Sequence, residues 1–483
     1  MNSPANTDAI KKPLVSYVDD FHALTNVHQR DLYTYSPQEV EEFRLKILQK
    51  RFNDLKDKVG ALRKLAEIQG VSEIKTLDDA APVLFQHTVY KSYPMPFLEK
   101  SRFDALTKWF DQLTAHDLSG IDASGCKLVE DWLNLLDRQT GLKPIHTTGT
   151  SGKLSFLPRA KKDWKIQIRL TLTRWQGMPG ERDISFDLDN PGFRLPIIQP
   201  GYQRGYYMAQ RLMDEQIALI GDPDRVESLY GDEVLSPDVL SLAGRVATAE
   251  AKGELDKLVI EPALLQKFKE SQEKARNKET MDAEFFDRVL NRFAGQRVMI
   301  GNTVPQLYAW AKEGHARGMK GIFQPDSLIG SGGGLKGQVL PDDWKQQIED
   351  VIGAPVTLAY GMSELCSMNT LCSHGNYHVP PYLIIYLLDE HSGEPLPRKG
   401  LQTGRAAMFD TVPDMYWGGF VTGDEITINW DGNCGCGRNG EYIHQDIRRF
   451  SDKNGNDDKI SCSGAPDAQE KAMEFLMRAA EKA

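Results

Sequence analysis

The sequence predicts an α/β fold with a helical N-terminal region. From about residue 297 onward, short apolar runs alternate with helical patterns, as in a sheet covered by helices. Before about residue 140, apolar residues recur instead at helical spacing. The chain has 483 residues, of which 40% are hydrophobic, so it can bury a sizeable core without disulfides and has room for two or three domains.

The clearest helix start is at residues 36–39. Ser36 can cap free backbone donors, Pro37 fits the first helical position, and Glu39 can complete a capping box. The helical stripe that follows is expected to pack in the core, and it consists of Val40, Phe43, Ile47, Phe52, Leu55, Val59 and Leu62.

Four short apolar runs predict strands in the second half of the chain. They lie at residues 298–300, 322–323, 356–359 and 382–388. A helix is expected at about residues 342–352, before the third strand.

We expect three regions: a helical region at 1–140, a core at 141–450 and a short C-terminal segment at 451–483. The charged residues at about 222–290 predict a solvated helical insertion in the core, and an arm that docks a partner is the alternative. The last segment is expected to contain one helix, at 467–480.

Charge and hydropathy exclude several classes of protein. A net charge of -10 argues against a chain that wraps nucleic acid or binds an anionic membrane by bulk charge. The first twenty residues contain no apolar run, and the longest such run, at 383–388, is too short to span a bilayer. We therefore expect a cytoplasmic protein whose six cysteines are reduced.

A hydroxyl- and glycine-rich run is the first candidate ligand site. It reads Thr147, Thr148, Gly149, Thr150, Ser151, Gly152 and Lys153. Glycines let a backbone approach a phosphate, hydroxyls donate to its oxygens and lysine adds positive charge. The spacing is not that of a Walker A loop. A flexible polar loop is the alternative.

Three shorter motifs follow it. Gly330-Ser331-Gly332-Gly333-Gly334 is a glycine run, which often marks only a tight turn. Tyr360-Gly361-Met362-Ser363-Glu364 follows a predicted strand, where α/β folds bind ligands, and offers an aromatic face and an oxygen ligand for magnesium. Asp424, in Thr422-Gly423-Asp424, can accept hydrogen bonds from two ribose hydroxyls. Each of these motifs alone is also compatible with an ordinary turn.

In this order, the four motifs resemble those of the adenylate-forming superfamily of acyl-CoA ligases, adenylation domains and luciferases. The resemblance covers about residues 140–465. Within this superfamily, the chain is similar to the phenylacetate-CoA ligase branch. The residues that carry this similarity are Cys372, Gly375, His378, the run LDEHSGEP from Leu388 and the run CGCGR from Cys434. The chain is also similar to the acyl-protein synthetases of bacterial bioluminescence. The fold implied is the large N-terminal α/β domain of these enzymes.

The resemblance implies a role for each motif. Residues 147–153 would hold the β- and γ-phosphates of ATP, with Thr148 and Lys153 as catalytic groups. Adenine would be held by Gly332, Gly333, Gly334 and the residues from Tyr360 to Ser363. Asp424 would hold ribose, and Glu364 would bind Mg²⁺. The implied reaction is attack of a carboxylate on the α-phosphorus, which needs positioning and charge stabilisation but no nucleophilic side chain.

The C-terminal end departs from the family pattern. Members carry a small mobile domain after a hinge, and its lysine contacts the reacting carboxylate. Residues 457–460 resemble part of this hinge, and Arg449 is the nearest equivalent of its arginine. Only about twenty residues follow, so we expect a truncated C-terminal subdomain.

Four residues have the ligand types of a zinc site. Cys372, His378, Cys434 and Cys436 supply three thiolates and one imidazole, which suit tetrahedral Zn²⁺. His374 and Cys366 are substitute ligands, and reduced surface cysteines are the alternative. Cys126 has no predicted function.

The main hypothesis is a ligase that activates a small carboxylic acid and passes the acyl group to CoA, a carrier protein or an amine. A second is an acyl-protein synthetase in which Cys462 accepts the acyl group, although this cysteine also fits a buried structural position. A third is a non-catalytic nucleotide-binding protein. His146, Tyr202, Tyr206 and Tyr207 are candidates for the acid pocket or for the core, and a homodimer is an expected assembly.

Overall fold

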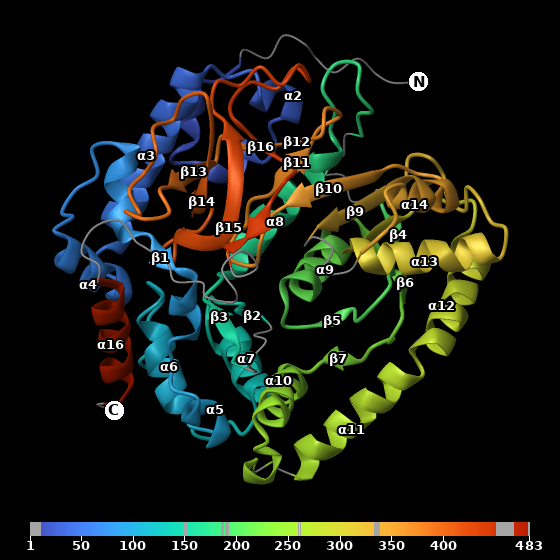
Figure 1. Ribbon diagram of the computed structural model, residues 1–483, viewed down its shortest axis with the longest axis horizontal. Coiled ribbons are helices and arrows are strands. Elements are labelled where there is room, and N and C mark those ends of the chain that lie inside the picture. The colour runs from blue at the N-terminus through green and yellow to red at the C-terminus, as the bar shows by residue number, and fades with distance from the viewer. Residues whose placement is uncertain are drawn as a thin grey trace.

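A computed structural model describes residues 11–147, 153–184, 188, 193–258, 260, 262–332, 339–450 and 468–481. These residues form a 13-stranded sheet with helices on both sides (Figure 1). Eleven of the strands follow one path, in the order β13-β14-β15-β16-β12-β11-β10-β9-β8-β4-β6, and β1 and β17 pair with β15 off this path. The predicted α/β fold is confirmed.

One half of the sheet is parallel. Its strands are β6 (Gly221–Ser228), β4 (Leu195–Gln199), β8 (Met299–Thr303), β9 (Leu328–Gly332) and β10 (Val356–Tyr360). One face packs against α12 (Lys278–Phe293), α13 (Val304–Ala316) and α14 (Trp344–Ile352). The other face packs against α8 (Lys161–Leu172) and α9 (Met208–Leu219). Because both faces are covered, the inner strands β4, β8 and β9 carry buried apolar residues on both faces, whereas β6 lies at the edge of the sheet.

The other half of the path is antiparallel. Its strands are β11 (Asn369–Leu371), β12 (Asn376–His378), β13 (Leu383–Leu388), β14 (Leu401–Asp410), β15 (Gly419–Asn429) and β16 (Tyr442–His444). The short strand β17 (Arg448–Arg449) pairs antiparallel with β15. The β10–β11 pair joins the two halves.

The N-terminal region is mainly helical, as predicted. Its elements are η1 (Leu14–Tyr17), α1 (Phe21–Leu24), α2 (Gln29–Leu32), α3 (Pro37–Leu55), α4 (Gly60–Gln69), η2 (Leu77–Val83), β1 (Phe85–Gln86), η3 (His87–Lys91), α5 (Pro96–Glu99), α6 (Phe103–Asp111) and α7 (Val129–Gln139). The capping box of α3 is confirmed, since Ser36 Oγ accepts from Glu39 N and Glu39 Oε2 accepts from Ser36 N.

Buried arginines fix the N-terminal helices to the sheet region. Arg44 Nε donates to the carbonyl oxygen of Pro381, and Arg51 Nε donates to that of Thr411, both at 3.1 Å. The predicted C-terminal helix is α16 (Ala468–Glu481), and Leu476 on it is fully buried in the same core as α4 and α6.

One predicted strand is wrong, and several strands were not predicted. Residues 322–323 do not form a strand; Ile322 N and Phe323 N donate to the carbonyls of Val351 and Ile352 at the end of α14. The next strand, β9, begins at Leu328. Strand β6 was not predicted, because it is a charged edge strand that contains a proline.

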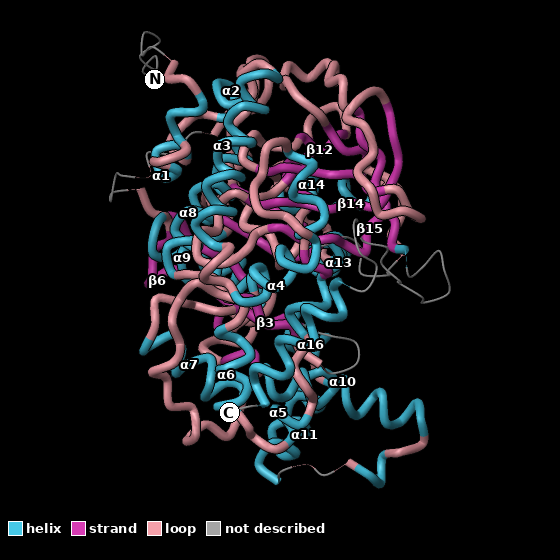
Figure 2. The backbone as a smooth tube through the Cα atoms, turned by 90° about the vertical axis from the view of Figure 1, so that its left-hand side faces the viewer, coloured by secondary structure: helices cyan, strands magenta, loops and turns pink. Residues whose placement is uncertain are grey.

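Helices form most of the charged segment at 222–290. They are α10 (Pro237–Lys252), α11 (Pro262–Arg276) and α12, together with the short η5 (Leu255–Lys257). Figure 2 shows α10 and α11 at the end of the molecule opposite β12 and β15. No helix among the described residues combines the length and apolar character needed to cross a bilayer.

Candidate nucleotide site and metal centre

Two of the sequence motifs meet at one carboxylate. Tyr360 is the last residue of β10, and its hydroxyl donates to Asp424 Oδ2 on β15 at 2.8 Å. Arg449 Nε on β17 lies 2.9 Å from the other oxygen, Oδ1. Asp424 is only 4% exposed. Burial and the Asp424 charge raise the pKa of the Tyr360 phenol well above its ordinary value, so Tyr360 stays protonated and donates.

The loop that follows Tyr360 is held by a buried arginine. Residues 361–368 connect β10 and β11, which pair as an antiparallel hairpin. Arg159 is fully buried, and its guanidinium donates to the carbonyl oxygen of Ser363 at 2.7 Å and to that of Leu365. Cys366 Sγ lies 3.0 Å from the same guanidinium. Arg159 thereby fixes the backbone on both sides of Glu364.

A buried aspartate holds the next part of this loop. Asp410, at the end of β14, is fully buried. Its Oδ2 accepts from Cys366 N at 2.6 Å and from Ser367 N at 2.8 Å, and its Oδ1 accepts from Ser367 Oγ at 3.0 Å. Sequence reasoning did not identify Arg159 or Asp410. Their only signal is a charged residue beside apolar runs, in SFLPRA and AAMFDTV.

Glu364 lies partly buried within this charged setting. Burial raises the pKa of its carboxyl, the positive charges of Arg159 and Arg449 oppose this, and the Asp424 charge adds to it. The Glu364 carboxyl therefore lies within electrostatic reach of Asp424.

The phosphate-loop candidate lies at the end of a two-stranded sheet. Strands β2 (Ile145–Thr147) and β3 (Ser155–Leu157) pair antiparallel. Thr147 ends β2, whereas Thr148, Gly149, Thr150, Ser151 and Gly152 lie outside the described residues. Lys153 is partly buried, with its Nζ 5.1 Å from the ring centroid of Tyr93. Burial and the charge of Lys91 both lower the pKa of Lys153. Lys91 and Lys153 therefore lie near each other, beside the start of β3.

The glycine run is described only in part. Gly330, Ser331 and Gly332 form the end of β9, and Gly333 and Gly334 lie outside the described residues. A β-carbon on Gly332 would lie 3.3 Å from the carbonyl oxygen of Ala359, beside the end of β10. The run therefore ends at the same edge of the sheet as the tyrosine motif.

The structure brings all four predicted zinc ligands together. One ligand atom from each of Cys372, His378, Cys434 and Cys436 lies within 4.8 Å of the others. Cys372 Sγ is 3.6 Å from Cys434 Sγ, and Cys436 Sγ is 3.1 Å from His378 Nε2. A tetrahedron with Zn–S bonds of about 2.3 Å has sulfur–sulfur edges of about 3.8 Å, so this donor set fits Zn²⁺.

The substitute ligands are not part of this group. Cys366 is fully buried beside Arg159 and Tyr416, in the loop after Glu364. His374 lies in the turn before β12, where its ring approaches Gly435 and Ser373.

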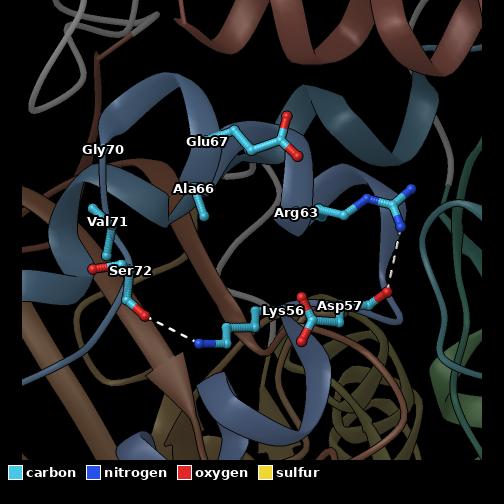
Figure 3. A pocket seen from close by; sticks show the side chains of 8 residues that line it. All are labelled: Lys56, Asp57, Arg63, Ala66, Glu67, Gly70, Val71 and Ser72. Carbon is cyan, nitrogen blue, oxygen red and sulfur yellow. Dashed lines mark hydrogen bonds between the residues drawn. The ribbon is translucent and has the colours of Figure 1, made fainter.

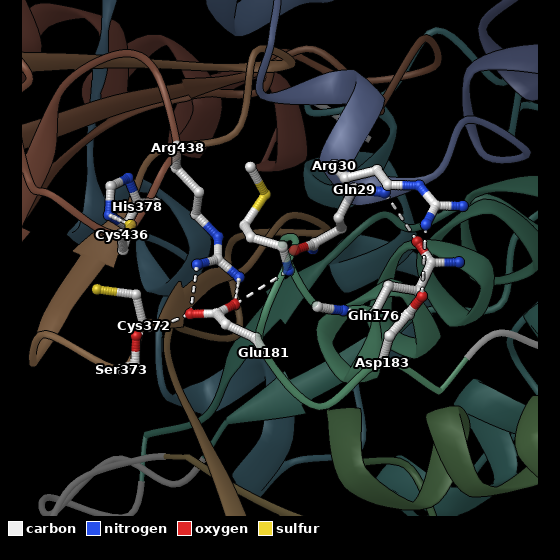
Figure 4. Close-up of polar contacts among 12 residues, drawn as sticks. Gln29, Arg30, Gln176, Glu181, Asp183, Cys372, Ser373, His378, Cys436 and Arg438 are labelled. Carbon is white, nitrogen blue, oxygen red and sulfur yellow. Dashed lines mark hydrogen bonds and ion pairs between the residues drawn. The ribbon is translucent and has the colours of Figure 1, made fainter. Parts of the chain in front are cut away.

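The Cys/His group continues into contacts with the N-terminal half of the chain (Figure 4). Arg438 Nη2 pairs with Glu181 Oε2 at 3.0 Å, and Ser373 Oγ donates to Glu181 Oε1 at 2.8 Å. Asn439 N donates to the carbonyl oxygen of Tyr33 at 3.0 Å. The turns that carry the cysteines therefore also position the segment around Glu181.

Among the pocket candidates, His146 is fully buried. The centroids of its ring and of the Tyr207 ring are 4.4 Å apart, in an edge-on contact. Burial lowers the pKa of His146 to about 3, so the ring is neutral. Tyr202 stacks on Tyr230 with centroids 4.0 Å apart. Tyr206 is buried in the core.

Of the remaining residues that the sequence singles out, the structure describes Cys126 but not Cys462 or residues 457–460. Cys126 is a buried core residue, and burial raises the pKa of its thiol. Cys462 and residues 457–460 lie outside the described part of the chain.

A surface cavity of about 360 Å³ lies elsewhere, on α3 and α4 and the segments that flank them (Figure 3). Within it Lys56 Nζ donates to the carbonyl oxygen of Ser72 at 3.1 Å. A second cavity of about 230 Å³ lies between α8 and α9 and includes His22. Neither cavity contains a residue of the four motifs.

Comparisons with known proteins find likeness among solved structures only. No family profile and no curated protein matches the sequence. The chain is similar to 2-hydroxyisobutyryl-CoA ligase in an open conformation with 2-HIB-AMP and CoA, at 14% identity over 86% of this chain and 76% of that chain, with a TM-score of 0.47. It is also similar to ATP-bound MatB from Rhodopseudomonas palustris, at 14% identity over 63% of this chain and 47% of that chain, with a TM-score of 0.35. At these values the likeness assigns no activity to this chain.

Proposed function

We propose that this protein is an ATP-dependent acid ligase of the adenylate-forming type. It converts a carboxylic acid and ATP to an acyl-adenylate and pyrophosphate. The observation that carries the proposal is the hydrogen bond from Tyr360 to Asp424, which joins two nucleotide-binding motifs separated by 64 residues. Tyr360 and Asp424 lie on different strands, and their contact brings the two motifs to one buried carboxylate.

The nucleoside is held at this carboxylate. Asp424 would accept hydrogen bonds from the ribose hydroxyls, because a carboxylate has two acceptor oxygens and each can take more than one bond. The Tyr360 ring and the glycine run ending at Gly332 flank the adenine. Glycine at this point lets the β9 backbone approach the base closely.

The phosphates are held between the lysine and the glutamate. Lys153, the hydroxyls of residues 147–151 and the backbone of the loop bind the β- and γ-phosphates. Glu364 supplies an oxygen ligand to Mg²⁺, which would neutralise phosphate charge during the reaction. Arg159 and Asp410 are positioning residues, because they fix the loop that carries Glu364.

The chemistry is an in-line displacement. A carboxylate oxygen of the acid bonds to the α-phosphorus, and the bond from that phosphorus to the bridging oxygen of pyrophosphate breaks. No proton transfer from the protein is needed, since the nucleophile is already an anion. The residues of the site therefore act by binding and orientation. The acyl group then passes from the adenylate to a thiol or an amine, with CoA, a carrier protein or a small amine as the acceptor classes.

The test is acid-dependent exchange of labelled pyrophosphate into ATP. The full chain is assayed with aryl, fatty, amino and dicarboxylic acids. Asp424→Asn and Glu364→Gln should abolish most of the exchange, whereas the matched control Glu270→Gln on α11 should keep it. If ATP binds and no acid class supports exchange, the proposed activity is wrong.

We also propose that Cys372, His378, Cys434 and Cys436 hold one Zn²⁺. Four protein ligands leave no open position, so the ion would be structural. It would tie the turn between β11 and β12 to the loop before β16.

A further inference from the structure

One row of residues interrupts the apolar face of the parallel strands. On the face that packs against α8 and α9, aligned core residues of β4, β8 and β9 are Ile197, Met299 and Leu328. The next row on this face, two residues nearer the carboxyl ends of the strands, consists of Gln199, Gly301, Gly330 and Thr357. We call this the glycine row. It lies at the edge of the sheet where α/β folds bind ligands.

An arginine lies over this row. Arg174 belongs to η4 (Thr173–Trp175), directly after α8, and its guanidinium lies 4.1 Å from the ring centroid of Trp175. A β-carbon on Gly330 would overlap this guanidinium. The neighbouring position, Gly301, is open toward the described residues, since none of their atoms lies within 4 Å of a β-carbon placed there. The guanidinium therefore lies on the sheet beside unfilled space.

This guanidinium has no anionic partner within the described part of the chain. Three buried arginines of this part pair with carboxylates, in the pairs Arg44–Glu441, Arg211–Asp137 and Arg438–Glu181, whereas Arg51 and Arg159 donate to backbone carbonyl oxygens. Arg174 makes no such pair, and its Nε is buried without a hydrogen-bond partner. Burial alone lowers the pKa of Arg174 to about 10, which leaves it charged at neutral pH. Arg174 is partly buried, so its charge is only partly solvated and would gain from pairing with a ligand anion.

Gln199 gives a second, independent sign of a ligand. It is 4% exposed, and its Nε2 donates to the carbonyl oxygen of Tyr202 at 3.3 Å. Its Oε1 is buried without a hydrogen-bond partner in the described structure. Polar side chains in such positions usually have a partner. Because Oε1 is an acceptor, it fits a donor group of a ligand and not a carboxylate, so the anion is assigned to Arg174 alone.

We propose that Arg174 binds a second carboxylate of the acid substrate, so that the enzyme activates short dicarboxylic acids. The inference rests on the proposed ligase function. One carboxylate of the acid is adenylated, and the other pairs with Arg174 over the glycine row. Arg174 is a specificity-determining residue and takes no part in bond formation.

The spacing along the strands fits this assignment. Thr357 is aligned with Gly330, and Tyr360 lies three residues further along β10. At about 3.3 Å per residue, the guanidinium lies roughly 10 Å from the level of Tyr360 along the strands. A carboxylate bound to Arg174 would therefore be separated from the nucleotide by the length of a short acyl chain. It would be a different carboxylate from the one that attacks the phosphorus.

The experiment measures pyrophosphate exchange by the full chain with malonate, succinate, glutarate and adipate. For each diacid, kcat/KM is compared with that for the monocarboxylic acid of equal length. The wild-type protein should prefer one or more of the diacids. Arg174→Met should lower kcat/KM for these diacids roughly 10- to 100-fold, the range for a lost charge-assisted hydrogen bond, and should leave the monoacids unchanged or improved. Arg174→Lys should restore part of the preference. Arg276→Met, at the exposed end of α11, is the control and should change nothing.

A second variant does not depend on the folding of an arginine variant. Gly301→Ala places a methyl group in the open space, and the φ of Gly301 is not in the left-handed region. It should weaken exchange with the longest accepted diacid most. Preference for monoacids in the wild type, or an equal loss for all acids in Arg174→Met, would overturn the inference and leave the ligase function intact. Absence of exchange with every acid would overturn both.

Discussion

Arg159 donates a hydrogen bond to the carbonyl oxygen of Ser363 across 204 residues of sequence. The arginine follows β3, at the start of the segment that leads into α8, and the serine lies in the loop that carries Glu364. The geometry of the proposed Mg²⁺ ligand is therefore set by the strand pair that also carries the phosphate loop.

We predict that Arg159→Lys lowers kcat for pyrophosphate exchange roughly 10- to 100-fold. The planar guanidinium of Arg159 donates to the carbonyl oxygens of Ser363 and Leu365 together. A lysine has a single ammonium group in its place, so the loop would lose at least one of these hydrogen bonds. The Mg²⁺ concentration needed for half-maximal exchange should rise, because Glu364 is the group whose position changes. A loss of stability with unchanged Mg²⁺ dependence would show that Arg159 has only a structural role.

We predict that Tyr360 and Asp424 are energetically coupled in ATP binding. Tyr360→Phe removes the hydroxyl and leaves the buried carboxylate with one partner fewer, so the affinity for ATP should fall about 10-fold. Asp424→Asn should have a larger effect, because it also weakens the pair with Arg449. In a double-mutant cycle the combined loss should be smaller than the sum of the two. Strict additivity would mean that the contact does not contribute to the site.

Local patterns in the sequence predicted some of the regular elements near the site, but not the strands that carry Thr147, Asp424 and Arg449. The capping residues before α3, the apolar run of β13 and the strand before Tyr360 are determined by neighbours in sequence, and each lies where expected. Strand β6 was missed because an edge strand needs no apolar pattern. Residues 322–323 were misassigned because two apolar residues can pack beside a helix end as readily as in a strand.

The contacts that shape the site could not be predicted in the same way. Arg159, Asp410 and Arg174 act on residues more than 40 positions away, and a single charged residue beside an apolar run does not name its partner. The Cys/His group was predictable because ligand chemistry restricts its members to a few residue types. The phosphate loop was named from its sequence, but five of its residues lie outside the described structure.

We predict one Zn²⁺ per chain after purification without added metal. Removal by a strong chelator should lower the Tm by several degrees, because the ion would join two turns that carry Arg438 and Ser373 onto Glu181. Cys436→Ser should abolish the bound zinc, whereas Cys126→Ser, remote from the group, should keep it. A full complement of zinc in Cys436→Ser would place the ion elsewhere.

The pH dependence of stability should show an aspartate that caps a helix from a distance. Asp238 on α10 is 7% exposed, and its two oxygens accept from Val129 N at 2.8 Å and Glu130 N at 3.1 Å at the start of α7. Burial raises the pKa of Asp238 to about 6, from an unfolded value of about 3.9. Between these values the unfolded chain releases the proton first, so the folded state loses stability as the pH rises.

The unfolding free energies of the wild type and of Asp238→Asn are measured by denaturant titration at several pH values from 4 to 7. The quantity of interest is the difference between the two proteins at each pH. This difference should shift against the wild type by roughly 1 to 3 kcal/mol between pH 4 and pH 6 and then stay constant. The common contribution of the other carboxylates cancels in the comparison. A shift in favour of the wild type over the same range would mean that the two backbone donors outweigh burial and hold the pKa of Asp238 below its ordinary value, as at a solvent-exposed helix cap.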